Sequence, residues 1–565
     1  MILVTEEQRQ KYSDSALWGD NPQTHSLDGI LRANARDHAN EIAMCDAPNR
    51  EQWTSGSARS STWGEFNKEV DILAAFLQGL RLAQNTVIAL YGPNTLEMAI
   101  SIFAINRAGF IAAPMPLYWR DSEMSEYLSE IQARAIITVE RVENDTPALR
   151  SRDLTHQLFS MKFILAYGDN LPDGVVGLDD ILKSVTEKLD KDPEFDEIDP
   201  NAIISLHPTS LQSRDTEIVL PRTSNQWLSS ERALFEDIND TKSILLPFAF
   251  SGLIGFCAGI VRSLKQNSSL HLHHFQTDKM LAGHLDLVKP ELVIMPQYCV
   301  AKQISQFSSN QNVTIGCVWK HNHLARMPVE QNDKCRQLFD ITVLNEVAAI
   351  GQLRVNAHHT PSLLPLSEDV SDLSFHIRKP TSSTLKKPQK MAGGELIATG
   401  ASVPESLFPS NSEKRALSRL RNKATCEGTH THVACRLNED DQTKCEPIGF
   451  LIDTIQRSNQ LVVAEELDSL YKSVPNIIDA AHFVDPANGE LNVAVVTRDQ
   501  DLSIETFGNQ LSKMGVSHLK VPLALYPTNE IKRGVGGVVL RHDLVKLIEQ
   551  NKTRKLMEDR QQAAI

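Results

Sequence analysis

The chain has 565 residues, with 57 Lys and Arg against 71 Asp and Glu, so its formal net charge at pH 7 is −14. Hydrophobic residues make up 41% and charged residues 23%, which excludes a wholly disordered, collagen-like or coiled-coil chain. The acidic balance argues against a protein that binds nucleic acid through its phosphates. At about 150 residues per domain, the length suggests several domains, or one large domain with a smaller companion.

Cysteine usage and apolar segments bear on the compartment. The chain has eight cysteines and no Cys-x-x-Cys pair, which favours a reducing compartment over a disulfide framework. The N-terminus shows no basic segment followed by an apolar run, so no signal peptide is expected. Residues 243–261 are uncharged over 19 residues, but Pro and Gly interrupt them. We expect a buried strand, a loop and a buried helix there, and a cytoplasmic protein without a membrane span.

Helical and strand patterns alternate in the first part of the chain, within residues 27–150. Apolar residues at helical spacing predict helices at residues 66–77 and 96–105. Short apolar runs predict strands at residues 87–90, 111–115 and 136–139. This rhythm predicts parallel sheets covered by helices.

The rest of the chain continues in a similar way. Further strands are predicted at residues 203–205, 244–246, 292–295 and 313–318. The polar segments 379–393 and 409–432 are typical of surface loops. A compact α+β module follows from about Gly449, with helices at 465–473 and 504–514 and strands at 480–484, 492–496 and 521–526.

A more specific pattern spans most of the chain. Its first part comprises Thr-Trp-Gly-Glu-Phe at 62–66, Pro-Asn-Thr-Leu-Glu at 93–97, Ala108-Gly109, Pro114 and Pro116. Its second part comprises Gly-Glu-Leu at 394–396, Gly449, Asp453, Ile455, Glu466, Asp468 and Leu-Arg-His-Asp-Leu at 540–544. In this order and at this length, the pattern resembles the adenylate-forming (AMP-binding) superfamily, which includes acyl-CoA synthetases, amino-acid adenylation domains and luciferases.

The resemblance implies an α/β fold with two domains. These are a large multi-sheet N-terminal domain, residues 1–448, and a small mobile α+β C-terminal domain, residues 449–565, hinged near Asp453. It also implies a chemistry in which a carboxylate attacks ATP, with Mg²⁺, to give an acyl-adenylate and pyrophosphate. A thiol such as that of CoA then takes the acyl group, and the C-terminal domain rotates between the two steps.

The phosphate loop departs from the superfamily's pattern, Thr-Ser-Gly-Thr-Thr-Gly-x-Pro-Lys-Gly-Val, whose counterpart here is residues 209–219. Thr209, Ser210 and Val219 match. The glycines, which let backbone N–H groups surround phosphate, are replaced by Leu211, Arg214 and Ile218. Glu217 replaces the lysine. At about 4 Å and an effective dielectric of about 20, this exchange turns an attraction of roughly 4 kcal/mol into a repulsion of similar size.

Other nucleotide-binding positions also depart from the pattern. Val538 replaces the catalytic lysine, a loss that typically lowers the rate by about 10²–10³. The ribose-binding Asp has no counterpart in residues 431–433 (Thr-His-Val), and the Gly-Arg next to the hinge is Gly449-Phe450. The turn facing adenine, residues 319–322, has no glycine pair. Glu346 survives from the Tyr-Gly-x-Thr-Glu motif, as the carboxylate expected near Mg²⁺ or as a buried structural group.

These departures favour a non-adenylating pseudoenzyme that binds an acyl ligand, a carrier protein or an active paralogue, with no cofactor and no catalytic residue. The remnant nucleotide-site positions are Thr209, Ser210, Glu346 and Asp453. The first alternative is an active ATP- and CoA-dependent ligase that uses Arg214, Arg222 or Lys532 instead. The second alternative is an enzyme that transfers acyl groups without ATP.

Two groups of His and Cys residues invite a metal hypothesis. One group comprises Cys426, His430, His432, Cys435 and Cys445, whose spacing matches no known zinc motif. The other comprises His271, His273, His274, His358 and His359. His271 and His273 share one face of a strand, which we interpret as a polar sheet edge. We expect no metal site in either group.

Overall fold

The computed structural model describes most of the chain in a series of ranges. These are residues 26–188, 193–209, 219–297, 299–300, 313–320, 335–354, 363–367, 372–378, 393–404, 428–438, 440–450, 454–457, 460–485, 490–499, 502–514, 516, 520–533, 539–541 and 543–547. The chain divides into two compact units. The first contains residues 1–320, 327–376 and 397–431, and the second contains 321–326, 377–396 and 432–565. The boundary expected between residues 448 and 449 stays a prediction.

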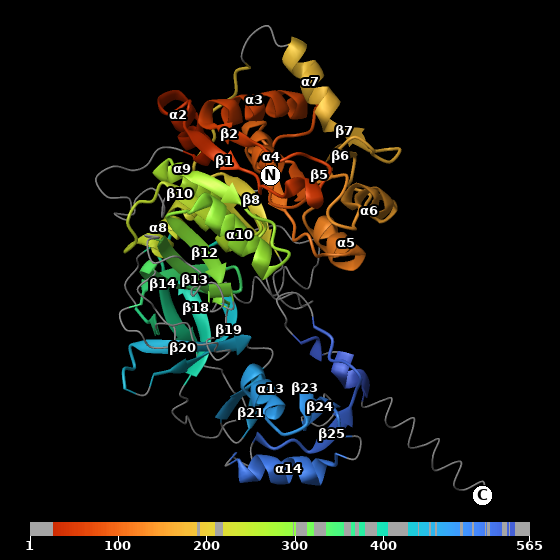
Figure 1. The fold of residues 1–565 in the computed structure, drawn as a ribbon, viewed down its shortest axis with the longest axis vertical. Coiled ribbons are helices and arrows are strands. Elements are labelled where there is room, and N and C mark those ends of the chain that lie inside the picture. The colour runs from red at the N-terminus through yellow and green to blue at the C-terminus, as the bar shows by residue number, and fades with distance from the viewer. Residues whose placement is uncertain are drawn as a thin grey trace, which may run out of the picture. The chain divides into compact units, whose positions relative to one another are not determined.

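A seven-stranded sheet in the first unit has the order β7-β6-β5-β3-β4-β8-β9 (Figure 1). Its strands are β3 (Val87–Tyr91), β4 (Ile111–Pro114), β5 (Ala135–Val139), β6 (Phe163–Tyr167), β7 (Val176–Gly177), β8 (Ile203–Pro208) and β9 (Val219–Thr223). β3 pairs in parallel with both β4 and β5, whereas β8 and β9 are antiparallel. The predicted parallel sheet is therefore confirmed.

Helices cover both faces of this sheet. They are α3 (Trp63–Gly79), α4 (Leu96–Arg107), α5 (Asp121–Glu130), α6 (Pro147–Leu154) and α7 (Leu178–Lys188), with short 3-10 turns at Arg50–Gln52 and Thr155–Gln157. Alternate residues of β3 enter two hydrophobic cores: Ile88 and Leu90 pack with α3 and α4, and Ala89 and Tyr91 pack with α5 and α6. Such alternation follows from the two-residue period of a strand.

The Thr-Trp-Gly-Glu-Phe motif has a local structural role. Thr62 precedes α3 and accepts a hydrogen bond from the Glu65 amide at 3.3 Å. The Glu65 side chain in turn accepts from the Thr62 amide at 2.9 Å. This reciprocal capping box satisfies two backbone donors that the helix start leaves open.

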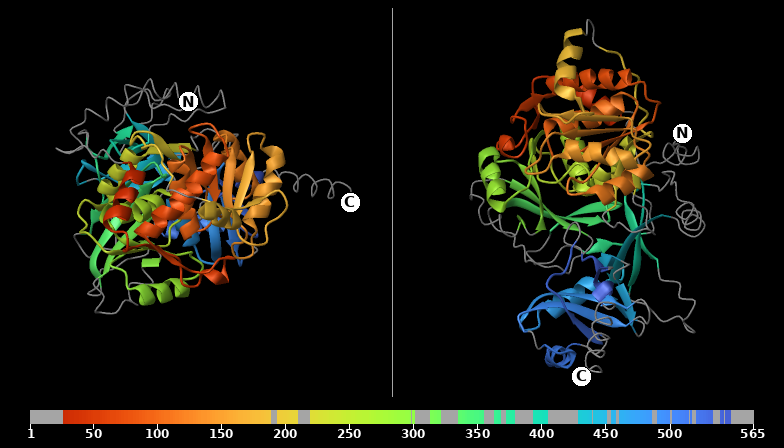
Figure 2. Two further views of the ribbon diagram at one scale, coloured as in Figure 1. Left: turned by 90° about the horizontal axis from the view of Figure 1, so that it is seen from above. Right: turned by 90° about the vertical axis from the view of Figure 1, so that its right-hand side faces the viewer.

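An eight-stranded sheet in the same unit has the order β15-β14-β13-β12-β10-β11-β1-β2. Its strands are β1 (Ile42–Cys45), β2 (Ser60–Thr62), β10 (Ser243–Leu246), β11 (Ser269–Leu272), β12 (Leu292–Pro296), β13 (Val313–Lys320), β14 (Cys335–Leu344) and β15 (Ala348–Leu353). Its helices are α2 (Leu27–Asp37), α8 (Ser224–Phe235), the π-helix η4 (Gly255–Val261), α9 (Arg262–Gln266) and α10 (Asp278–Val288). Figure 2 shows both large sheets with their helices from two further sides.

The uncharged segment 243–261 forms the buried strand β10, a loop and the buried π-helix η4, as the sequence predicts. A glycine is required at the start of η4, because a Cβ on Gly255 would lie 1.8 Å from the carbonyl oxygen of Ala249. Among the described residues, no helix combines the length and the apolar character that crossing a membrane requires.

The remaining strands lie later in the chain. A five-stranded sheet has the order β16 (Leu364–Pro365), β20 (Lys444–Phe450), β19 (Thr429–Leu437), β18 (Gly393–Thr399) and β17 (Ser374–Arg378). The prediction of a loop over residues 409–432 is wrong at its end, because β19 begins at Thr429. The rest of that loop, from 409 to 427, lies outside the described residues.

The second unit contains the predicted α+β module. β21 (Thr454–Arg457) pairs with β22 (Gln460–Val463), and a separate sheet has the order β23 (Ile477–Val484), β24 (Leu491–Thr497) and β25 (Ala524–Pro527). Its helices are α13 (Ala464–Lys472) and α14 (Ile504–Lys513). The last strand starts three residues later than 521, where the sequence predicts it.

Candidate functional site

The surviving carboxylate, Glu346, lies in a tight turn between β14 and β15 of the first unit. Leu344 and Ala348 are the last paired residues of the two strands, and the Val347 amide donates to the Leu344 carbonyl at 2.9 Å. Asn345 and Glu346 have φ of +51° and +61°. Two successive positive φ values are typical of a type I′ turn, and a Glu rarely adopts this conformation. The surrounding structure therefore holds Glu346 in place.

Both carboxylate oxygens of Glu346 contact groups of the chain itself. The Lys320 ammonium lies 3.0 Å from Oε1, and the Leu253 amide donates to Oε2 at 2.6 Å. Lys320 is the last residue of β13 and pairs with Val343 of β14, which brings its side chain next to the turn. The Glu346 side chain is 7% exposed and that of Lys320 is 45% exposed.

Tyr118 follows the Pro114 and Pro116 positions of the motif. Its side chain is 50% exposed, and partial desolvation of its phenol, together with the negative charge of Glu346, raises the pKa of Tyr118. The phenol is therefore neutral at physiological pH.

Arg222 of β9 is fully buried behind the turn. Its guanidinium donates to the carbonyl oxygens of Glu346 and Val347 at 2.9 Å and of Ser402 at 3.0 Å, and it lies 4.6 Å from the ring of Trp227. Burial lowers the pKa of Arg222 to about 10, so the group stays charged at neutral pH. Arg222 thus holds the turn in place through its hydrogen bonds to backbone carbonyls.

The loop before η4 is held by residues of the first sheet. Asn94, from the Pro-Asn-Thr motif, donates to the Phe248 carbonyl at 2.5 Å and accepts from the Phe250 amide at 3.3 Å. His207 of β8 lies 3.0 Å from the Ser251 carbonyl, and burial lowers the pKa of His207 to about 3. These contacts position the segment whose Leu253 amide reaches Glu346.

Only some of the other predicted site positions lie within the described residues. Thr209 is buried directly after β8. Ser210, Asp453 and Val538 lie outside the described residues. Sequence reasoning did not assign Lys320, Leu253 or Tyr118 to the site. Lys320 stands within the adenine-turn segment, but its pairing with Glu346 depends on the β13–β14 register.

Motif residues of the second unit serve a structural cluster. Asp468 of α13 contacts the His482 imidazole at 3.0 Å and the Arg541 guanidinium at 2.8 Å, and Arg541 donates to the His482 carbonyl at 2.8 Å. Burial alone would raise the pKa of Asp468, but these partners lower it below the ordinary value. The cluster joins α13, β23 and the segment at 541.

His432, at the position that the resemblance places near ribose, contacts the carboxylate of Glu395. His432 has φ of +58°, its amide donates to the Glu395 carboxylate at 3.3 Å, and its Nδ1 lies 3.6 Å from the same oxygen. Glu395 is the central residue of the Gly-Glu-Leu motif. The motif carboxylate is therefore engaged with His432, which stands in the segment that the resemblance aligns with the ribose-binding motif.

The prediction that His271 and His273 mark a polar edge of a sheet is wrong. β11 lies between β10 and β1, and His273 is buried directly after it. The Nδ1 atoms of His273 and His284 lie 3.0 Å apart. Within the described part of the chain, no group of three or more His, Cys, Asp or Glu could hold a metal ion. Cys426, His358 and His359 lie outside it.

Comparison with known proteins relates the chain to a known superfamily. Residues 31–210 match the family model described as AMP-binding enzyme. The chain is related to the adenylate-forming superfamily. The resemblance stated from the motifs is thereby confirmed, and the match covers the strands and helices from α2 to the end of β8.

Individual members of the superfamily are similar over nearly the whole chain. The probable CoA ligase CCL9 of Humulus lupulus is 22% identical over 524 residues, which cover 85% of this chain and 90% of that protein. The anthranilate CoA ligase AuaEII, solved with anthranoyl-AMP, has a TM-score of 0.70 at 14% identity over 94% of this chain and 99% of its own. The O-succinylbenzoate CoA synthetase MenE of Bacillus subtilis, solved with AMP, has a TM-score of 0.67 at 14% identity. The match covers 91% of this chain and 97% of MenE. The fold is that of acyl-CoA synthetase-like enzymes.

Proposed function

We propose that this chain is an acyl-CoA synthetase homologue that binds an acyl ligand or a protein partner without forming an adenylate. The observation that carries this proposal is the environment of Glu346. Its two oxygens already contact the Lys320 ammonium and the Leu253 amide, at 3.0 and 2.6 Å. A Mg²⁺ ion needs carboxylate oxygens at about 2.0–2.1 Å and would have to displace the ammonium.

The loss of positive charge at other positions supports the same proposal. Glu217 and Val538 stand where the superfamily has lysines, and the match to the family model ends at Ser210, inside the altered loop. Arg222 does not compensate, because its guanidinium is buried and donates to three backbone carbonyls. The residue types at these positions therefore do not fit a Mg·ATP complex, and we assign no adenylation step to them.

The second candidate function is an active ATP-dependent CoA ligase. The long alignment with a probable CoA ligase favours it, as does Lys532, which is exposed in the second unit and could supply a cation. This candidate requires saturable binding of Mg·ATP. An enzyme that transfers acyl groups without ATP would instead bind an acyl thioester and no nucleotide.

Pyrophosphate–ATP exchange over a panel of aliphatic and aromatic carboxylic acids tests the proposal. The wild-type protein is compared with Glu346→Gln, which keeps the size of the side chain and removes its charge. We expect both proteins to match the rate of the enzyme-free reaction. Exchange that depends on an added acid and is abolished in Glu346→Gln would overturn the proposal in favour of the active ligase.

A further inference from the structure

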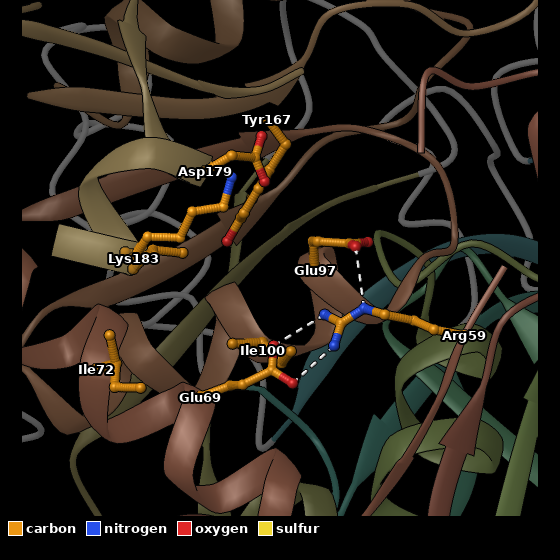
Figure 3. A pocket seen from close by; sticks show the side chains of 9 residues that line it. Arg59, Glu69, Ile72, Glu97, Ile100, Tyr167, Asp179 and Lys183 are labelled. Carbon is orange, nitrogen blue, oxygen red and sulfur yellow. Dashed lines mark hydrogen bonds and ion pairs between the residues drawn. The ribbon is translucent and has the colours of Figure 1, made fainter. Parts of the chain in front are cut away.

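A pocket in the first unit lies at the carboxyl ends of β5 and β6, and sequence reasoning did not assign it. Its first chamber has a volume of about 300 Å³ and its second about 220 Å³. The two chambers adjoin, since both are lined by Glu97, Tyr167, Asp179 and Lys183. Figure 3 shows these four side chains with the others that line the first chamber. The larger volume is at the lower end of the range typical of small-molecule sites.

The topology of the sheet favours a ligand at this place. From β3 the chain crosses to β4 on one side, and from β5 it continues to β6 on the other, so the connections diverge between β3 and β5. Open α/β sheets bind ligands outside the carboxyl ends of their strands at such a switch point. The second chamber lies there, because Glu97 stands in the first turn of α4, which follows β3, and residues 139–141 end and follow β5.

Ion pairs organise the inner wall of the pocket. Arg59 forms a two-pronged pair with Glu69 at 2.7 and 2.9 Å and reaches Glu97 at 3.4 Å (Figure 3). Arg50 contacts Glu97 at 2.9 Å and the buried Asp46 at 2.6 Å. Burial alone would raise the pKa of Glu97, but the charges of Arg50 and Arg59 lower it below its ordinary value. This wall is preformed and charged.

Carboxylates outnumber cations around both chambers. The first chamber is lined by three carboxylates and two cationic side chains, and the second by four and three. Asp179 accepts from the Gly168 amide at 2.8 Å, and among the described residues no Lys or Arg lies within ion-pair distance of its carboxylate. Ile72, Ile100 and Leu182 supply an apolar side to the first chamber. The charge excess and the apolar side complement a small organic cation.

We propose that this pocket binds a small molecule with an ammonium group and a short apolar arm. The ammonium pairs with Asp179, and the arm packs against Ile72, Ile100 and Leu182. The pocket is a different site from Glu346, so its occupancy does not depend on whether the chain adenylates an acid.

Three probes of matched size test the charge preference of the pocket. n-Butylammonium, n-butanol and butyrate are titrated against the full-length protein and followed by saturation-transfer NMR. A unit charge about 4 Å from its partner in water contributes about 1 kcal/mol, so we expect n-butylammonium to bind about fivefold more tightly than n-butanol. Butyrate should bind most weakly. Equal affinity of the three probes, a preference for butyrate, or no binding of n-butylammonium would overturn the proposal.

Two aspartates, one inside and one outside the pocket, allow a matched test of location. Asp179→Asn should weaken n-butylammonium binding about fivefold, while the Asn oxygen can still accept from the Gly168 amide. Asp173→Asn makes the same change of net charge at an exposed side chain that lines neither chamber, so binding should stay unchanged. Leu182→Phe should also weaken binding without altering charge. Equal effects of the two aspartate substitutions would contradict the assignment.

Discussion

At the scale of single residues, Glu346 shows how a motif carboxylate can be held by groups of the protein itself. Its backbone adopts a strained positive φ, its carbonyl accepts from Arg222, and its carboxylate pairs with Lys320. The position of this carboxylate could be predicted from the sequence motif. Its partners could not, because they depend on strand register and on a loop that lies 93 residues away in the chain.

Arg222 gives the first prediction. Arg222→Met removes the donor to three buried carbonyls, so the free energy of unfolding should fall by about 2–4 kcal/mol. Arg36→Met is the matched control, because Arg36 is 73% exposed and, among the residues that the structure describes, pairs only with its neighbour Asp37. Its effect should stay within about 0.5 kcal/mol. Urea unfolding midpoints measure both. Equal midpoints for the two variants would contradict the role of Arg222.

The buried histidine pair gives a prediction about pH. Burial, with a smaller effect from nearby imidazoles, lowers the pKa of His273 to about 3 and that of His284 to about 4. An unfolded histidine takes up its proton near pH 6.5, so the unfolded state binds more protons below that pH and stability falls as pH falls. Between pH 7.5 and 5, each histidine should remove about 2 kcal/mol of stability.

When the pH falls from 7.5 to 5, the double variant His273→Phe/His284→Phe should therefore lose about 4 kcal/mol less free energy of unfolding than the wild type. The measurement is the unfolding midpoint at pH 7.5 and at pH 5, so a general loss of stability cancels. An unchanged pH dependence in the double variant would show that the pair is protonated in the folded state.

At the scale of elements, local signals predicted the helices and the central parallel strands. The capping box at Thr62 and Glu65, the helical spacing before Gly79 and the apolar run at β3 each have a local physical cause. The start of β19 and the interior position of β11 could not be predicted, because both depend on pairing with distant strands. Polar residues such as Thr429 and His271 suggest a loop or a sheet edge when the strands that pair with them are unknown.

The start of η4 gives an element-scale prediction. Gly255→Ala would place a methyl group 1.8 Å from the Ala249 carbonyl oxygen, so we expect a loss of about 3 kcal/mol or more. Gly283→Ala is the matched control in α10, where a Cβ meets nothing within 4 Å, and it should stabilise by about 0.5–1 kcal/mol. Thermal unfolding of the two variants checks this. Similar melting temperatures would show that the loop before η4 adapts.

At the scale of the whole molecule, the second unit is stabilised by contacts within itself. The Asp468, His482 and Arg541 cluster uses motif residues that the sequence analysis could identify by family, although their contacts only follow from the folded arrangement. Family motifs thus include residues that hold the fold as well as residues that bind nucleotide. Their survival here is consistent with a retained fold and altered chemistry.

Removal of the Asp468 carboxylate tests this structural role. Asp468→Ala leaves Arg541 and His482 without their shared partner, so the second unit should lose about 3 kcal/mol of stability. Hydrogen exchange should accelerate in residues 464–484 and stay unchanged in β3 and β4 of the first unit. Asp441→Ala, at a carboxylate that is 40% exposed, is the control and should change neither. Unaltered exchange in 464–484 would contradict the role of the cluster.

The central claim concerns ATP, and calorimetric titration of the purified full-length protein with Mg·ATP tests it most directly, because it requires no knowledge of the acid. We expect no detectable heat of binding from a folded protein. Saturable binding at micromolar to sub-millimolar affinity, weakened by Glu346→Gln, would contradict the claim and justify an exchange assay for the active ligase.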